Sequence, residues 1–191
     1  MIDGKTNTFS HLIEGVGESP TGLALDKKRN QLYVLLLGST EVAVVDLSTN
    51  KVVKNYPTQG ESAINLVYDA KGDRIFVSHQ KSNNVTVLNA ANGELISTIP
   101  ADEGAIGIQF DSERQLLYVA NRKAGSVTVI NGKNYEVIKN IETGTHPNTV
   151  AINQKTGAAY ITNKAKSVRV KEGEPTPPED ENGDTVSLIL P

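Results

Sequence analysis

The chain has 191 residues, and its 19 Lys and Arg against 22 Asp and Glu give a net charge of -3. This near balance excludes a strong overall attraction to nucleic acid or to an anionic membrane surface. The lack of cysteine excludes disulfides, thiolate catalysis and cysteine-ligated metals. No apolar run is long enough to span a bilayer, and no signal peptide is visible at the start of the chain.

The first predicted element is a strand over residues 6–13. Ile13 follows Ile2 by eleven residues, just as Ile141 follows Ile130 by eleven, and a Gly-Lys turn comes soon after the first residue of each pair. Residues 6–13 therefore resemble the strand that ends at Ile141. Residues 6–13 are therefore predicted to be the outer strand of a blade whose other three strands do not precede it in this sequence.

The rest of the chain is a repeat of about 42 residues. An inner apolar strand ends in turn at Asp26, Asp69, Asp111 and Asn153, which are spaced by 43, 42 and 42 residues. A polar turn, a strand with an aromatic residue, a longer loop and two more β-branched strands follow in each repeat. Four short strands in a repeat of roughly 40–45 residues are typical of one β-propeller blade.

The sequence therefore predicts an all-β fold, a single β-propeller domain with four-stranded antiparallel blades. The blades are placed at about 20–57, 62–100, 105–142 and 147–190. The fourth blade has no outer strand, which we expect the strand at 6–13 or another chain to supply. If another chain supplies it, two chains share their open blade edges as a homodimer with an eight-bladed ring.

The fourth repeat also contains an insertion, at about 164–184. It is rich in proline and charged residues and poor in apolar ones. Such a composition is typical of mobile loops rather than of packed strands.

The repeats resemble those of a known family. YVTN-type propeller repeats resemble two segments of this chain, Tyr118–Asn121 and Tyr160–Asn163. A strand rich in valine or leucine follows each of them. Ser19–Asp26 and Gly144–Ala151, together with the late insertion, narrow the resemblance to the last four blades of YncE-like proteins. That resemblance implies a bacterial periplasmic location and a seven-bladed parent propeller, of which this chain would be a truncated part.

Propeller ligands bind mostly where the loops between the second and third strands meet the loops between blades. We call this side the loop face. We expect it to bind a small ligand or a protein without catalysis. The polar candidates on it are His79, Lys81, Asn83, Asn121, Arg122, Lys123, His146, Asn163 and Lys164. The competing interpretation is that the Asn side chains cap turns and the cations are simply solvated.

No catalytic residue, metal site or cofactor is predicted, because the three histidines are scattered and no nucleophile motif occurs. One alternative is a lactonase-like enzyme, which would hold a divalent metal with carboxylates. Its repeated acids near the channel mouth are Glu18, Glu61 and Glu103. The other alternative is nucleic-acid binding by the cations of the loop face, which are Arg122, Lys123 and Lys164.

Overall fold

The structure is a computed structural model that describes residues 1–37, 39–166 and 178–191. Its regular elements are all β-strands, and they form separate antiparallel sheets, so the predicted fold class is confirmed. Among the described residues there is no helix that could cross a membrane.

Three sheets have four strands each, in sequence order. The first blade contains β3 (Pro20–Asp26), β4 (Gln31–Leu36), β5 (Glu41–Asp46) and β6 (Lys51–Pro57). The second contains β7 (Ala63–Asp69), β8 (Arg74–His79), β9 (Asn84–Asn89) and β10 (Leu95–Pro100). The third contains β11 (Ala105–Asp111), β12 (Leu116–Asn121), β13 (Ser126–Asn131) and β14 (Val137–Glu142).

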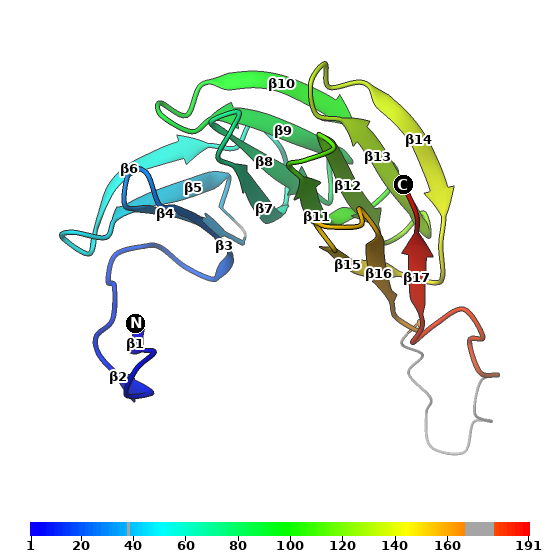
Figure 1. Ribbon diagram of the computed structural model, residues 1–191, viewed down its shortest axis with the longest axis horizontal. Helices are drawn as coiled ribbons and strands as arrows, with labels where there is room; N and C mark the ends of the chain where they lie inside the picture. The colour runs from blue at the N-terminus through cyan, green and yellow to red at the C-terminus, as the bar shows by residue number, and fades with distance from the viewer. Residues whose placement is uncertain (38, 167–177) are drawn as a thin grey trace.

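The fourth blade has three strands among the described residues: β15 (Pro147–Ile152), β16 (Ala159–Asn163) and β17 (Val186–Ile189). The blades stand side by side in an open arc, with the first and fourth blades at its two ends (Figure 1). Neighbouring inner strands contact each other along the arc, β3 with β7, β7 with β11, and β11 with β15.

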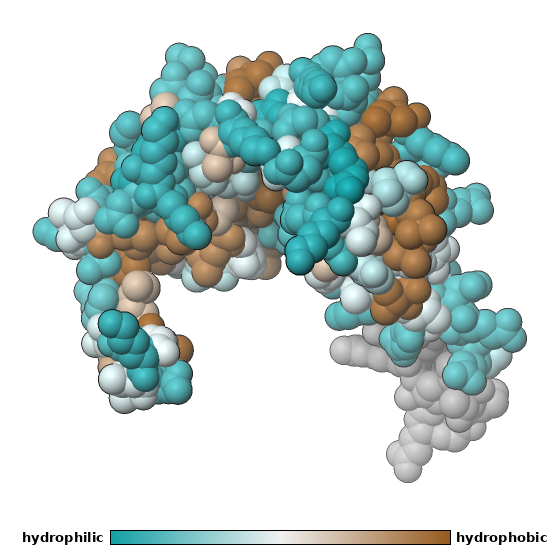
Figure 2. All heavy atoms as spheres, in the orientation of Figure 1, coloured by the Kyte–Doolittle hydropathy of each residue, from teal (hydrophilic) through white to brown (hydrophobic). Residues whose placement is uncertain are grey.

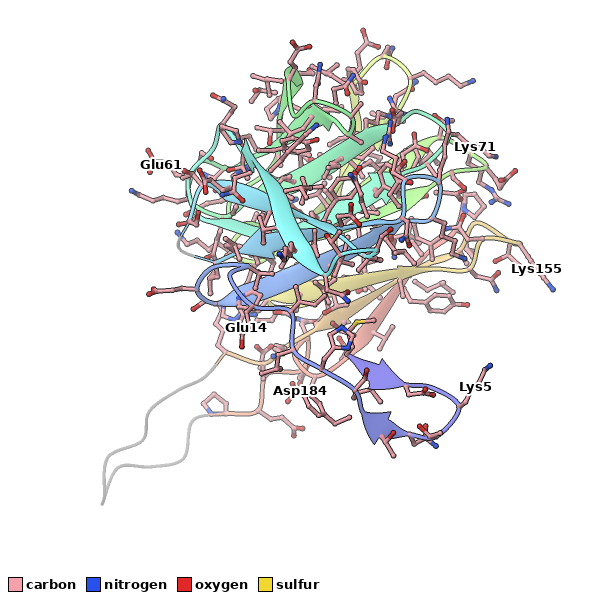
Figure 3. All side chains as sticks on the ribbon, turned by 90° about the vertical axis from the view of Figure 1, so that its left-hand side faces the viewer. Lys5, Glu14, Glu61, Lys71, Lys155 and Asp184 are labelled. Carbon is pink, nitrogen blue, oxygen red and sulfur yellow. The ribbon has the colours of Figure 1, made fainter. Side chains whose placement is uncertain are left out.

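Asp and Asn side chains shape the hairpin turns. The Asp111 carboxylate accepts backbone N–H bonds from Glu113 and Arg114, both at 3.0 Å, and Asn153 accepts one from Lys155 at 3.0 Å. Such bonds fold the chain back on itself and fix the register of the strands on either side. These turns form the turn face, opposite the loop face, and Figure 3 shows Lys155 on the side away from Glu61.

In the first two blades, the aromatic residue of the second strand joins its blade to the next. Tyr33 is fully buried and donates its hydroxyl hydrogen to the Ala90 carbonyl of the second blade at 3.0 Å. In the second blade, the Phe76 ring packs at 5.1 Å from the Phe110 ring of the third. Among the described residues, three core clusters lie between neighbouring blades. A fourth lies on the first blade, where Ile13 and Val16 pack against Val34 and Val45. Blades are therefore stabilised largely by apolar contacts with their neighbours.

A buried arginine adds a polar link between the second and third blades. Arg74 pairs with Asp69 at 3.0 Å, and their side chains are 8% and 1% exposed. The guanidinium also donates to the carbonyl of Gly132 and lies 5.0 and 5.5 Å from the ring centres of Phe76 and Phe110. Its hydrogen bonds and its cation–π contacts thus cross the blade boundary.

The N-terminal strand does not complete the fourth blade of its own chain. Of residues 6–13, only β2 (Thr8–Phe9) forms a strand, and it pairs with β1 (Ile2–Asp3). This short hairpin lies beside the open side of the arc, away from β17 (Figure 1). The prediction of closure within one chain is therefore wrong, because the arc keeps the two ends apart.

The insertion predicted at 164–184 lies largely outside the described residues, because its residues 167–177 are not among them. The described part, from Pro178 onward, includes a turn at the base of β17. Asp180 anchors this turn by accepting a hydrogen bond from the Thr145 hydroxyl at 2.9 Å.

Candidate functional site

Three of the candidate residues, His79, Asn121 and Asn163, occupy the same repeat position at the ends of β8, β12 and β16. All three are buried. The Asn121 amide donates to Thr128 Oγ1 at 2.8 Å, and the Asn163 amide donates to Ser187 Oγ at 2.9 Å. The two asparagines thus tie the second strand to the third, whereas neither ring nitrogen of His79 has a hydrogen-bond partner among the described residues. None of the three side chains reaches the surface, so none belongs to the site.

Glycines cover two of these side chains. A Cβ atom on Gly60 would overlap the His79 ring, and one on Gly144 would overlap the Asn163 amide. Only glycine permits such close approach of the backbone. Burial lowers the pKa of His79 to about 4, although backbone groups of Asn84 and Val77 oppose this shift. Its imidazole is therefore neutral at neutral pH.

Two of the candidate lysines lie in ion pairs on the surface of the loop face. Lys81 pairs with Glu61 at 2.6 Å, and Lys123 pairs with Glu103 at 3.2 Å. Asn83 is also engaged, because its side-chain oxygen accepts the Gly104 N–H at 2.8 Å. In the second blade the candidates are thus occupied by partners within the fold.

The junction between the third and fourth blades is different. It holds a cavity of about 230 Å³ that opens on the loop face. Three cationic side chains and one histidine line this cavity, together with small and polar residues. The lining residues are Arg122, Lys123, Ala124, Gly125, Thr143, Gly144, Thr145, His146, Lys166 and Asn182. We call this the junction cavity.

His146 enters the cavity from a strained loop position. Its φ is +43°, and the corresponding residues of the other blades, Ser19, Ser62 and Gly104, also have positive φ. The repeat thus requires a left-handed backbone here, which glycine adopts without the steric cost that a side chain brings. Its Nδ1 is buried without a hydrogen-bond partner among the described residues.

The charges around His146 are mostly positive. Burial, and then the charges of Arg122 and Lys166, lower its pKa, while Asp180 opposes them. Arg122 donates to the Asn148 side-chain oxygen at 2.6 Å, a neutral partner, so its charge is not cancelled by that contact. The lining residues themselves include no carboxylate.

The structure thus brings together Arg122, Lys123 and His146 of the predicted candidates. Lys164 follows β16 directly, and its backbone N–H donates to the His146 carbonyl at 3.2 Å, but it is not among the lining residues. The described residues contain no group of three His, Cys, Asp or Glu side chains arranged to hold a metal.

Thr145 and Asn182 also line the cavity but were not singled out from the sequence. A usable signal existed at Thr145, since it occupies the repeat position of Glu61 and Glu103, 42 residues after the latter. Glu61 and Glu103 each pair with the lysine 20 residues later, whereas the fourth repeat has Thr145 and Ala165 at these two positions. Asn182 carries no such signal, because it belongs to the insertion.

Residues 16–158 match a family model described as a YNCE-like beta-propeller. The chain belongs to the YncE-like β-propeller family. This confirms the family resemblance drawn from the repeat motifs and the late insertion. The blades seen here are therefore YncE-like blades.

Curated relatives agree with this membership. The chain is 34% identical to the uncharacterized protein YncE of Salmonella typhi and 35% identical to that of Escherichia coli K12, over 184 residues in both cases. These alignments cover 94% of the chain and 51% of each relative. The chain thus spans about half the length of the curated relatives it matches.

Solved structures support the fold alone. A structure of Kuenenia stuttgartiensis hydrazine synthase matches with a TM-score of 0.69 at 16% identity, over 80% of this chain and 45% of that one. A functionally unknown protein from Desulfotomaculum acetoxidans DSM 771 matches with a TM-score of 0.67 at 15% identity, over 76% and 49% of the two chains. At such identity the likeness concerns architecture and not chemistry.

Proposed function

We propose that this YncE-like chain is a non-enzymatic binding module whose junction cavity takes a small anion, a carboxylate or phosphate group. The observation that carries the proposal is the lining itself, with Arg122 and Lys166 around His146 and no carboxylate among the lining residues. Lys123 also lines the cavity, but Glu103 pairs with it. Hydrogen bonds from cations to anionic oxygens are about twice as strong as neutral ones. Arg122 offers the planar fork that suits carboxylate and phosphate.

The size of the cavity supports a small ligand. Its volume of about 230 Å³ lies below the roughly 300–1,000 Å³ of sites for drug-sized molecules. An anionic group of a few atoms fits this space, and the remainder of a larger ligand would lie on the open loop face. The unpartnered Nδ1 of His146 supplies one more polar contact.

Titration calorimetry with inorganic phosphate and with citrate tests the proposal. Arg122→Ala should weaken binding at least tenfold, which is about 1.4 kcal/mol of binding free energy. Lys81→Ala is the matched control, since Lys81 is a cation of the same face that pairs with Glu61 outside the cavity. Equal losses in both variants, or no binding of either anion by the unaltered protein, would contradict the proposal.

A second variant restores the acid of the other blades. Thr145→Glu should abolish anion binding, because it places a carboxylate at the cavity where Glu61 and Glu103 stand in the preceding repeats. Unchanged binding in this variant would show that the anion binds elsewhere. A nucleic-acid partner would instead be favoured if the unaltered protein bound single-stranded DNA with an affinity that falls steeply with salt. In that case Lys81→Ala and Arg122→Ala should weaken the binding equally.

A further inference from the structure

The two ends of the arc expose side chains whose counterparts are buried at the junctions within the chain. In the first blade Leu23 is 65% exposed, whereas its counterparts Leu66 and Ile108 in the next two repeats are each 5% exposed. In the fourth blade Tyr160 is 43% exposed, whereas its counterpart Tyr118 in the third blade is 2% exposed. On the first blade this exposure is confined to the inner strand, because Ile13 and Val16 pack against Val34 and Val45.

The third strand of the fourth blade shows the same contrast. Val186 and Leu188 are 61% and 54% exposed, while Val85 and Val87 at the same positions of the second blade are fully buried. Figure 2 shows hydrophobic side chains gathered over both end blades of the arc. Large exposed apolar surfaces on a folded protein usually mark an interaction site.

The junctions inside the chain show what each surface fits. At the junction of the second and third blades, Phe76, Val85 and Val87 form one core cluster with Ile108. The fourth blade exposes Tyr160, Val186 and Leu188, the counterparts of Phe76, Val85 and Val87. The first blade exposes Leu23, the counterpart of Ile108. The exposed surface of the fourth blade therefore fits the exposed surface of the first blade, and neither surface fits a second copy of itself. Copies of the chain would thus associate head to tail.

The N-terminal hairpin indicates the same neighbour. Ile2 pairs with Phe9 just as Ile130 pairs with Val137 in the hairpin between β13 and β14. Asp3 accepts the Lys5 N–H at 2.8 Å, as its counterpart in that hairpin, Asn131, does for the residue two positions on. Residues 1–9 therefore have the geometry of a hairpin between the third and fourth strands of a blade.

The order of strands along the chain indicates to which blade the N-terminal hairpin belongs. In every junction the outer strand of one blade runs directly into the inner strand of the next: β6 into β7, β10 into β11, and β14 into β15. By the same order, the segment before β3 belongs to a blade that precedes the first. In the described chain the fourth blade is the one without an outer strand.

We propose that two copies of this chain associate head to tail in an eight-bladed ring, in which residues 10–13 of each copy pair with β17 of the other. The exposed ends then become two more blade junctions, and no sheet edge is left without its outer strand. Eight blades lie within the range of about 4–8 that propellers form. In the ring, the partner's β17 takes the place of β1 beside the N-terminal outer strand. Little strand pairing is lost in this exchange, because β1 is exposed and has only two residues.

The pairing can be tested with cysteines, because the chain has none of its own. Thr128 pairs with Asn140 in the third blade, and the corresponding residues are Ser187 and Leu12. Mixing the single variants Leu12→Cys and Ser187→Cys under mild oxidation should give a covalent species of two chains. Thr49→Cys, an exposed turn residue of the first blade, replaces Ser187→Cys in the control mixture.

A two-chain product from the first mixture, and none above background from the control, supports the ring. Equal yields in the two mixtures, or no product in either, would overturn it. A double variant Leu12→Cys, Ser187→Cys that forms its disulfide within one chain would also overturn it, since four blades would then close alone. The neighbouring pair, His11→Cys with Leu188→Cys, repeats the test should the first pair disturb folding.

Discussion

Replacing Arg74 with alanine should lower the free energy of unfolding by about 3–5 kcal/mol, the loss typical of breaking a buried ion pair. The replacement leaves the Asp69 carboxylate, 1% exposed, without its buried counter-charge. It also removes the hydrogen bond to the Gly132 carbonyl and the stacking on Phe76 and Phe110, which join two blades. Urea unfolding followed by circular dichroism measures the change.

Lys71→Ala is the matched control for this prediction. Lys71 lies on the same turn face and pairs with Glu113 of the next blade at 2.7 Å, but both side chains are exposed. Exposed pairs contribute little to stability, so this variant should unfold almost as the unaltered protein does. Similar effects of the two replacements would show that burial of Arg74 does not stabilise the junction.

Acidification should destabilise the protein through His79. The pKa of this side chain is about 4 in the folded state, against roughly 6.5 in an unfolded chain. Between these values the unfolded state binds a proton that the folded state does not, so the stability present above pH 6.5 is lost as the pH falls. At about 1.4 kcal/mol for each pH unit, the loss by pH 4 is roughly 3 kcal/mol.

His79→Asn separates this effect from the titration of all other groups. Asn121 and Asn163 show that asparagine suits the position, where its amide would find the hydroxyl of Thr86. The variant should lose less stability than the unaltered protein between pH 7 and pH 4, with the difference approaching 3 kcal/mol. Parallel pH profiles of the two proteins in urea unfolding would refute the assignment.

Most of the fold could be read from the sequence because a propeller blade is a local structure. Asp26, Asp69 and Asp111 mark the same turn in each repeat, and the aromatic residues that follow mark the junctions. The position of residues 6–13 could not be read in this way. Their hairpin is encoded locally and forms, but its outer partner depends on the curvature of the arc, which no single repeat specifies.

The candidate site was less predictable than the fold. His79, Asn121 and Asn163 look like surface ligands in the sequence, because polar residues beside loops suggest exposure. In the structure all three side chains are buried, so they are not surface ligands. This burial depends on how the blades pack together, which the sequence of one repeat does not show. The cavity lies where the sequence departs from the repeat, with Thr145 at the position of Glu61 and Glu103.

In the proposed ring, each copy of the chain is an open arc that the second copy closes. Light scattering on the unaltered protein as it leaves a size-exclusion column tests this most directly. One chain has a mass of 20.5 kDa. We expect twice that mass at micromolar concentration. Tyr160→Asp should shift the mass toward that of a single chain, because it places a charge in the new junction. A single-chain mass for the unaltered protein at all concentrations would contradict it.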